Sequence, residues 1–231
     1  MIGGIIYGQD TAAATDPSWS SVTSLLHFNG ADGSTTFTDE TGRAWTPTNG
    51  AKISTTASRF GGASMGVGAV NGVPNSYITT ASSADFAYGT GDFTWEAFIY
   101  RAANPASNEY ILDHGAVNGG TLFVASSGKV GYYNPTTGLG ALYTPASSAS
   151  IIILSSWNHI TATRSAGITR LFVNGVNVAQ AADTHNWSGP TSLSIGKGNS
   201  WNGHIDEVRI TKGVARYTGN FVVPSSEFPN A

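Results

Sequence analysis

The sequence predicts an all-β protein in which two antiparallel sheets pack face to face, and three observations lead to this fold class. Apolar and polar residues alternate with a period of two over many short runs. Glycine is abundant, with 29 residues, and turn sequences recur roughly every 8–12 residues. No window of about a dozen residues has a helical period. About a dozen short strands in a sandwich or barrel are therefore expected.

Length and composition narrow the class of protein further. A chain of 231 residues fits one large β domain. Cysteine is absent, which excludes disulfides and thiolate metal sites. Charged residues make up 11% of the chain, but 40% hydrophobic residues argue against disorder. With a net charge of −3 and no cluster of lysine or arginine, the chain is not expected to bind nucleic acid.

The first 20 residues differ from the rest, and we predict an N-terminal arm over residues 1–20 and a sandwich domain over 21–231. The apolar side chains Ile2, Ile5, Ile6 and Tyr7 precede a polar, turn-like stretch. They are expected to pack on another chain, with folding back onto the sandwich as the alternative. No apolar run is long enough for a signal peptide or a spanning helix. Synthesis in the cytoplasm without membrane insertion is expected.

Individual strands can be assigned from the alternation. Residues 93–100 form a strand with apolar side chains on both faces, opened by a turn at 89–92. Asn174-Gly175 between two apolar runs predicts a type I′ hairpin, and Ser127-Gly128 predicts a second hairpin. Residues 204–211 alternate as a strand, and residues 213–217 are expected to form a single helical turn.

Motifs stand at Asp16–Trp19, Leu25–Asp39, Ser58–Ser64, Gly89–Glu96, Trp157–Ile160, Leu171–Gly175 and Gly203–Tyr217. In this order along the chain, they resemble the concanavalin A-like lectin/glucanase superfamily, and within it the laminin-G-like domains of bacteriophage virion and tail proteins. The resemblance covers residues 16 to about 228 and implies a two-sheet antiparallel jelly roll. Fold alone does not set function, because this superfamily includes lectins, hydrolases and adhesion modules.

The acidic residues do not form a hydrolytic pair. Retaining glycoside hydrolysis needs two carboxylates about 5–5.5 Å apart on one face. Glu96 is flanked on its own face by Thr94 and Phe98. The neighbours Asp206 and Glu207 are expected to point to opposite faces of their strand. No catalytic residue is therefore assigned, and the protein is not expected to be an enzyme.

Asp206 is the candidate metal ligand. It is expected to share a strand face with Val208 and Ile210, and a carboxylate on an apolar face must be paired, hydrogen-bonded or bound to a metal. The resemblance implies a structural calcium ion held by Asp206 with oxygens of Asn29, Asp32, Gly61 and Gly62. Asn29 stands where many relatives carry aspartate, which should weaken binding. The alternative is that Asp206 caps backbone N–H groups or pairs with an arginine.

Glycan binding would require exposed aromatic rings. Trp45, Trp95 and Trp157 match core positions of the resembled family, so they are expected to be buried. Other rings lie near turns rich in asparagine and glycine and could stack on a sugar or, alternatively, cover a sheet edge. The candidate glycan residues are Tyr132, Tyr133, Trp187, Trp201 and Asn186.

Two functional classes follow from these observations. The first is a non-enzymatic virion protein, a capsid decoration, tail or fibre module of a bacteriophage. Its arm would dock on other virion proteins, its copies would form a homo-oligomer, and its domain would bind host glycans on the particle surface. The second is a free bacterial carbohydrate-binding lectin, and a glycoside hydrolase is the third, less favoured reading.

Overall fold

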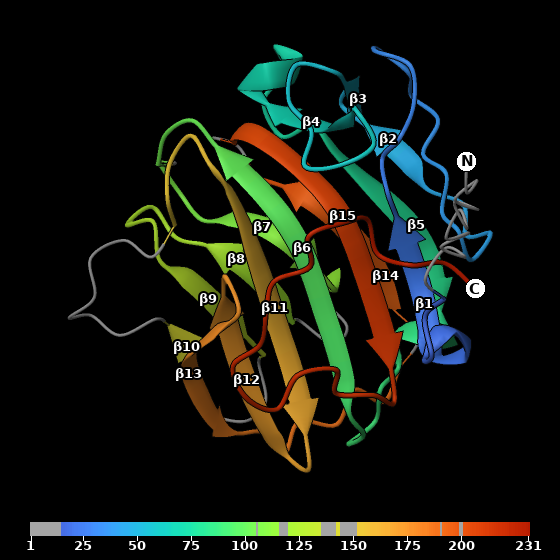
Figure 1. The fold of residues 1–231 in the computed structure, drawn as a ribbon, viewed down its shortest axis with the longest axis vertical. Helices are drawn as coiled ribbons and strands as arrows, with labels where there is room; N and C mark the ends of the chain where they lie inside the picture. The colour runs from blue at the N-terminus through green and yellow to red at the C-terminus, as the bar shows by residue number, and fades with distance from the viewer. Residues whose placement is uncertain are drawn as a thin grey trace, which may run out of the picture.

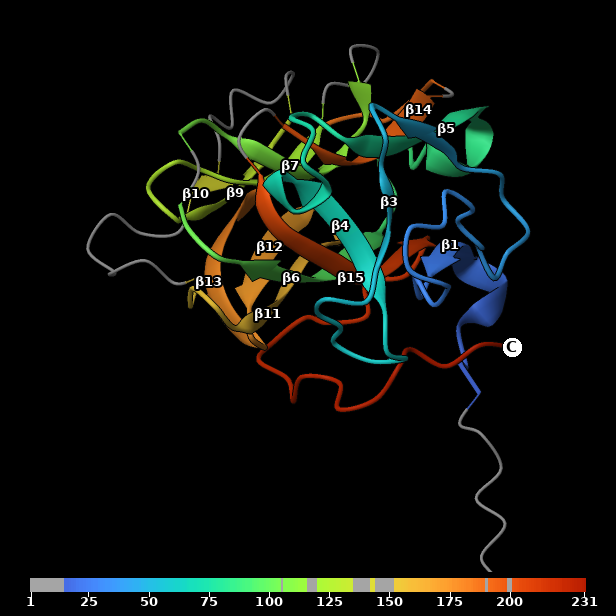
Figure 2. The same cartoon turned by 90° about the horizontal axis from the view of Figure 1, so that it is seen from above.

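The computed structural model describes residues 15–104, 106–115, 120–134, 152–189, 191–198 and 201–231, together with the backbone of 142–143. Two antiparallel sheets pack against each other as a sandwich, which confirms the predicted fold class (Figures 1 and 2). We call the eight-stranded sheet A and the seven-stranded sheet B. The described residues include three short 3₁₀ turns, at Trp19–Ser21, Ala69–Asn71 and Ala84–Phe86. None of these is long enough to span a membrane.

The strand order shows many crossovers. Sheet A runs β13 (Val176–Ala182), β12 (Ile168–Val173), β11 (Trp157–Ser165), β6 (Phe93–Arg101), β15 (Asn202–Lys212), β4 (Ser64–Gly68) and β3 (Lys52–Ser54), and β1 (Val22–Leu26) also pairs with β15. Sheet B runs β10 (Leu142–Tyr143), β9 (Val130–Tyr133), β8 (Thr121–Val124), β7 (Glu109–Asp113), β14 (Thr191–Lys197), β5 (Tyr77–Ser83) and β2 (Thr46–Thr48).

Aromatic rings fill the space between the sheets. Trp95 is fully buried, with its ring stacked on Phe93 at a centroid distance of 4.8 Å and on His114 at 4.4 Å. Trp187 meets Trp95 edge to face at 5.3 Å. Burying such large rings is the main source of stability in a core of this kind. The expected burial of Trp95 is confirmed.

Both predicted hairpins form. Asn174 (φ 49°) and Gly175 (φ 78°) join β12 to β13, and both adopt the positive φ that a type I′ turn requires. Residues 125–129 join β8 to β9, with the N–H of Ala125 donating to the carbonyl of Lys129. The strand predicted over residues 93–100 is β6, and nearly all of its side chains are buried on both faces.

Strand β15 is central because one of its edges pairs with two strands. Residues 202–205 pair with β4, and residues 208–211 pair with β1. Between these segments the register with β6 shifts, and Glu207 has a φ of 51°. The extra residue is a β-bulge, which bends the strand and redirects its side chains.

The C-terminal strap, which we define as residues 213–231, crosses the outer face of sheet A (Figures 1 and 2). The single helical turn predicted at residues 213–217 does not form. Thr94 in β6 donates its hydroxyl to the carbonyl of Val214 and accepts the N–H of Arg216, so β6 holds the strap extended. Contacts with the sheet outweigh the weak local helical preference.

The structure places the last residues of the predicted arm against the sandwich. Asp16 is 5% exposed, its N–H donates to the carbonyl of Asn230, and its carboxylate binds Arg209 and Arg216. Trp19 packs on a small outer cluster with Leu25. Residues 16–20 therefore belong to the sandwich, while Ile2, Ile5, Ile6 and Tyr7 lie outside the described residues.

Candidate functional site

The acidic residue that most resembles a catalytic group lies beneath the strap. Glu96 of β6 is fully buried, and its carboxylate lies 2.8 Å from Arg209 Nη2 and 3.2 Å from His159 Nε2. The hydroxyl of Tyr217, in the strap, donates to Glu96 Oε2 at 3.0 Å. These partners come from β15, β11 and the strap, so Glu96 sits in a closed polar network.

The electrostatics of Glu96 suit a structural role. Burial raises its pKa, but the charge of Arg209 and the hydrogen bond from His159 outweigh burial and lower the pKa to about 2. A general acid needs a raised pKa and access to the bond that it protonates. Glu96 has a lowered pKa and no exposed surface, so it is not arranged as a glycosidase acid.

The bulge places Asp206 and Glu207 on the same side of sheet A, which corrects their expected opposite orientation. Asp206 pairs with Phe98, whose ring belongs to the outer cluster rather than to the core between the sheets. Glu207 Oε2 accepts the N–H of Phe228 in the strap. Val208 then returns to the core, so Asp206 does not share its face. Simple alternation failed because the extra residue shifts the phase by one.

Asp206 clamps a loop through hydrogen bonds. Its Oδ2 accepts the N–H groups of Arg59 at 2.7 Å and Phe60 at 3.3 Å, and its Oδ1 accepts that of Glu207 at 2.9 Å. This is the N–H-capping arrangement considered as the alternative to a metal ligand. Burial nevertheless raises the pKa of Asp206 to about 8. The ionised carboxylate lacks a cationic partner among the described residues.

The other residues of the predicted calcium set are only partly gathered. A Cβ on Gly61 would overlap Asn29 Oδ1, so this amide oxygen lies directly over the loop that Asp206 holds. Glu227 Oε1 lies beside it and accepts from Asn29 Nδ2 at 2.8 Å. Asp32 is exposed, and its carboxylate accepts the N–H of Thr55 instead. The described contacts do not join Gly62 to Asp206, Asn29 or Asp32, so its role as a ligand stays a prediction.

The donor chemistry around this loop suits a hard cation only in part. Asp206, Asn29 and Glu227 offer oxygens, which calcium prefers. Within the described ranges, however, no three acidic or histidine side chains come together as a metal cluster. Sequence reasoning missed Glu227, since nothing in its local sequence indicates that the strap returns to Asn29. Calcium at this loop stays a prediction.

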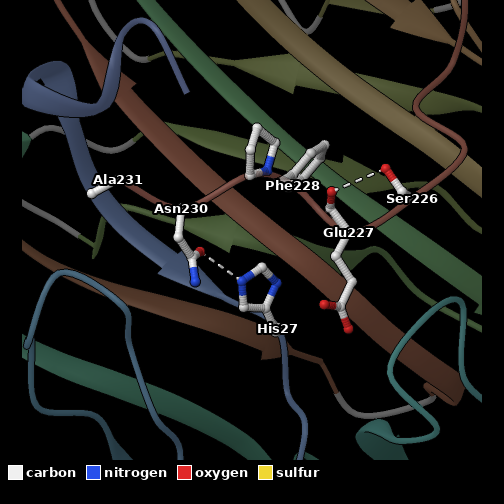
Figure 3. A pocket seen from close by; sticks show the side chains of 7 residues that line it. His27, Ser226, Glu227, Phe228, Asn230 and Ala231 are labelled. Atoms are coloured by element: carbon white, nitrogen blue, oxygen red, sulfur yellow. Dashed lines mark hydrogen bonds between the residues drawn. The ribbon is translucent and has the colours of Figure 1, made fainter. Parts of the chain in front are cut away.

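A cavity of about 280 Å³ opens between the end of β1 and the end of the strap (Figure 3). His27 Nδ1 lies 2.7 Å from Glu207 Oε1, and His27 Nε2 lies 2.9 Å from Asn230 Oδ1. Both partners are acceptors, so both ring nitrogens donate. Burial lowers the pKa of His27, but Glu207 outweighs burial and raises the pKa to about 9. The ring joins the strap to β15 and is fully engaged in that role.

Three of the rings predicted to bind glycans are buried. Trp187 is 0% exposed, Trp201 is 1% exposed and Tyr132 is 1% exposed. The hydroxyl of Tyr132 donates to Asp183, and Trp187 packs in the central aromatic cluster. Buried rings cannot stack on a sugar, so the predicted aromatic surface does not form. Of that set, Tyr133 is 39% exposed and Asn186 is exposed.

A second cavity, of about 410 Å³, lies at the end of sheet B where β5 and β7 begin and β14 ends. We call it the end pocket. Tyr110 and Lys197 face each other across the pairing of β7 with β14, and both are half-buried. The loops before β5 and β7 supply amide and hydroxyl groups. Its lining residues are Asn75, Ser107, Asn108, Tyr110, Lys197 and Gly198.

The floor of the end pocket is backbone. Gly198 has a φ of 151°, and its N–H donates to Asn75 Oδ1 at 3.1 Å. A Cβ at this position would overlap the carboxylate of Glu109, which is fully buried beneath it. Glycine is therefore required, and it leaves room above for a ligand. The Nδ2 donors of Asn75 are directed to no described acceptor.

Comparisons with known proteins agree with this architecture. The profile of the concanavalin A-like lectin/glucanases superfamily matches residues 71–215. Domain 4 of AbnA, an extracellular arabinanase from Geobacillus stearothermophilus solved with arabinotriose, has a TM-score of 0.62 at 13% identity, covering 84% of this chain and 94% of that one. No curated protein sequence matches.

Two further solved structures show the same fold within longer chains. The binding domain of botulinum neurotoxin DC, solved with SialylT, has a TM-score of 0.60 at 12% identity and covers 84% of this chain and 48% of that one. Trypanosoma rangeli sialidase with sialic acid has a TM-score of 0.59 at 11% identity and covers 89% and 34%. At such identities these structures establish the fold alone. Since the profile covers more than half of the chain, the protein belongs to the concanavalin A-like lectin/glucanases superfamily.

Proposed function

We propose that this protein is a non-catalytic carbohydrate-binding protein and that the end pocket is its sugar site. The end pocket carries the proposal because it combines a partly exposed ring, Tyr110, with amide donors and acceptors from Asn75 and Asn108. Sugar sites need an apolar surface for the C–H face and a few fixed polar groups for the hydroxyls.

The placement of the carboxylates supports binding without hydrolysis. Glu96 is buried and ion-paired under the strap, and Asp206 and Glu207 are engaged with backbone groups and His27. Hydrolysis needs two accessible carboxylates on one sugar. None of the described residues that line the end pocket carries a carboxylate.

The fold neighbours add weaker support. Their descriptions name an arabinanase domain with arabinotriose and a neurotoxin binding domain with SialylT. These ligands belong to those proteins, and the fold is compatible with sugar binding on several surfaces. The sequence resemblance to phage virion domains extends the proposal to an attachment role, in which the protein on a particle surface holds host glycans. Mass spectrometry of purified particles tests that setting.

The binding test uses the full chain on a glycan array, followed by calorimetry with the best ligand. We expect Asn108→Ala and Tyr110→Ala each to weaken binding by roughly tenfold or more, equivalent to about 1.4 kcal/mol. Asn108 is exposed, so its substitution should leave the unfolding midpoint unchanged.

Two matched variants locate the site. Tyr100→Ala removes a half-buried ring from sheet A and should leave binding unchanged. Tyr133→Ala tests the exposed ring of the originally predicted surface. A blank array contradicts the proposed function. Binding that is lost in Tyr133→Ala but kept in Tyr110→Ala would move the sugar site to β9.

A further inference from the structure

We infer that the end pocket selects uncharged sugars, and that the Lys197–Asp113 ion pair sets this selectivity. The inference rests on the proposed function, because it names the class of sugar that the end pocket takes. It depends on how the charges around the pocket are paired and on which groups remain free for a ligand.

Among the described residues that line the end pocket, Lys197 is the charged one, and Asp113 neutralises it. Its Nζ lies 3.0 Å from Oδ2 of Asp113, which is three residues along β7 from Tyr110, and 6.0 Å from the centroid of the Tyr77 ring. Asp113 is 8% exposed and lies behind the ammonium group. Its Oδ1 accepts the N–H of Gly115 at 3.0 Å, which fixes the carboxylate in place. The protein therefore fixes the position of Asp113, and through it the ion pair with Lys197.

A second pair of opposite charges lies beneath the floor. Glu109 is fully buried under Gly198, and its charge acts on Arg101, which is 1% exposed. Among the described residues, Lys197 is balanced by Asp113 and Arg101 by Glu109. A ligand that enters the pocket thus meets balanced pairs of charge in this part of the structure.

The free donors of the pocket suit hydroxyl groups. An ammonium group has three N–H donors, and Asp113 takes one of them, so the others remain for sugar oxygens. Asn75 and Asn108 add amides that both donate and accept. A sugar carboxylate would instead compete with Asp113 for Lys197, and the two like charges would repel each other at close range.

The test compares neutral sugars with acidic counterparts. The probes are galacto-oligosaccharides against galacturono-oligosaccharides of equal length, and lactose against sialyllactose, within a general array. We expect the unmodified protein to bind neutral members and to bind their acidic counterparts at least about tenfold more weakly.

Asp113→Asn is the decisive variant. It keeps the acceptor oxygen for Gly115 while freeing the charge of Lys197. We expect acidic sugars to bind at least about tenfold more tightly to this variant than to the unmodified protein, and the gain to disappear at high salt. The double variant Asp113→Asn with Lys197→Gln should lose the gain. Asp85→Asn, which breaks the ion pair with Arg43 in another loop, should change nothing.

The outcomes separate the two levels of the proposal. Binding of acidic sugars by the unmodified protein, or no gain in Asp113→Asn, overturns the selectivity while sugar binding itself stands. Neutral binding that survives Tyr110→Ala shows that the sugar lies elsewhere and overturns the inference as well. Failure of every sugar to bind refutes the proposed function.

Discussion

Chemical reactivity at the scale of single residues depends on surroundings more than on residue type. Glu96, His159 and Tyr217 would be a plausible acid–base group if they lined a cleft. Here they are sealed by the strap and neutralised by Arg209. Tyr110 belongs to no such network of charges, but its ring is partly exposed beside the amides of Asn75 and Asn108. The residue with the less reactive side chain is the better functional candidate.

The Glu96 network should contribute stability that depends on pH. Because the folded pKa is about 2 and an unfolded glutamate titrates near 4.5, the contribution is complete above pH 4.5 and is lost as pH falls through 2. Glu96→Gln leaves Arg209 buried with Asp16 as its one carboxylate partner among the described residues. We expect a loss of about 3 kcal/mol at pH 7, measured by denaturant unfolding, and a smaller loss at pH 3.

Glu40→Gln is the matched control for this experiment, since Glu40 is exposed. Its substitution should change stability by less than about 0.5 kcal/mol. An equal loss for Glu96→Gln at pH 7 and pH 3 would show that the carboxylate stabilises the fold by packing rather than by charge.

The aromatic residues show where sequence reasoning reached its limit. Tyr132 and Tyr133 are consecutive in β9, so alternation alone allows only one of them to face solvent, and that one is Tyr133. Trp187 and Trp201 adjoin polar turns, yet tertiary packing draws both rings inward. Asn75 and Asn108 each lie just before a strand, which is a usable sequence signal for a loop. The sequence does not show which strands lie side by side, so it could not bring these two loops together.

Among the elements, β15 does the most to organise the molecule. Its edge is divided between β4 and β1, and the bulge at Asp206-Glu207 sits where one partner ends and the other begins. The strand was predictable from its alternation. The bulge was not, because Glu207 adopts a positive φ without the glycine that usually marks it.

The loop beside this bulge is the predicted calcium site. Proton and cation would compete for Asp206, whose folded pKa is about 8 against 3.8 unfolded. Protonation of Asp206 therefore stabilises the folded state as the pH falls below 8. Because calcium needs the ionised carboxylate, it should raise the unfolding midpoint more at pH 9 than at pH 6.5. Thermal unfolding with calcium and with chelator measures this. Asp206→Asn should abolish any difference, and identical midpoints at both pH values in the unmodified protein would refute the site.

At the scale of the whole molecule, the two-sheet architecture could be predicted from the alternation of apolar and polar residues and from the recurring turns. Long strands that are buried on both faces can pack in few other ways. The boundary of the domain was harder to place. Asp16 lies in a polar, turn-like sequence, and only the return of the strap reveals its arginine partners. Local sequence cannot report a contact between residues 200 positions apart.

Two deletions test the revised boundary. Removing residues 1–14 should leave the unfolding midpoint unchanged, and, if the arm docks on a partner chain, it should abolish oligomerisation or particle attachment. Removing residues 1–20 should in addition destabilise the domain by about 3–5 kcal/mol, because the buried Arg209 and the partly buried Arg216 lose Asp16. Size-exclusion chromatography and denaturant unfolding measure the two effects. Equal stability of both deletions would place residues 16–20 outside the cooperative unit.

The hydrogen bond from the Asp16 N–H to the Asn230 carbonyl joins the two ends of the sandwich at 2.9 Å. This junction lies on sheet A, whereas the end pocket belongs to sheet B. A short linker could therefore close the chain into a ring, and new ends could be opened in a surface turn such as Asn174-Gly175 without disturbing the pocket. Because the ends of the sandwich lie on the side of sheet A, a partner attached to either end would leave the end pocket of sheet B accessible to a ligand.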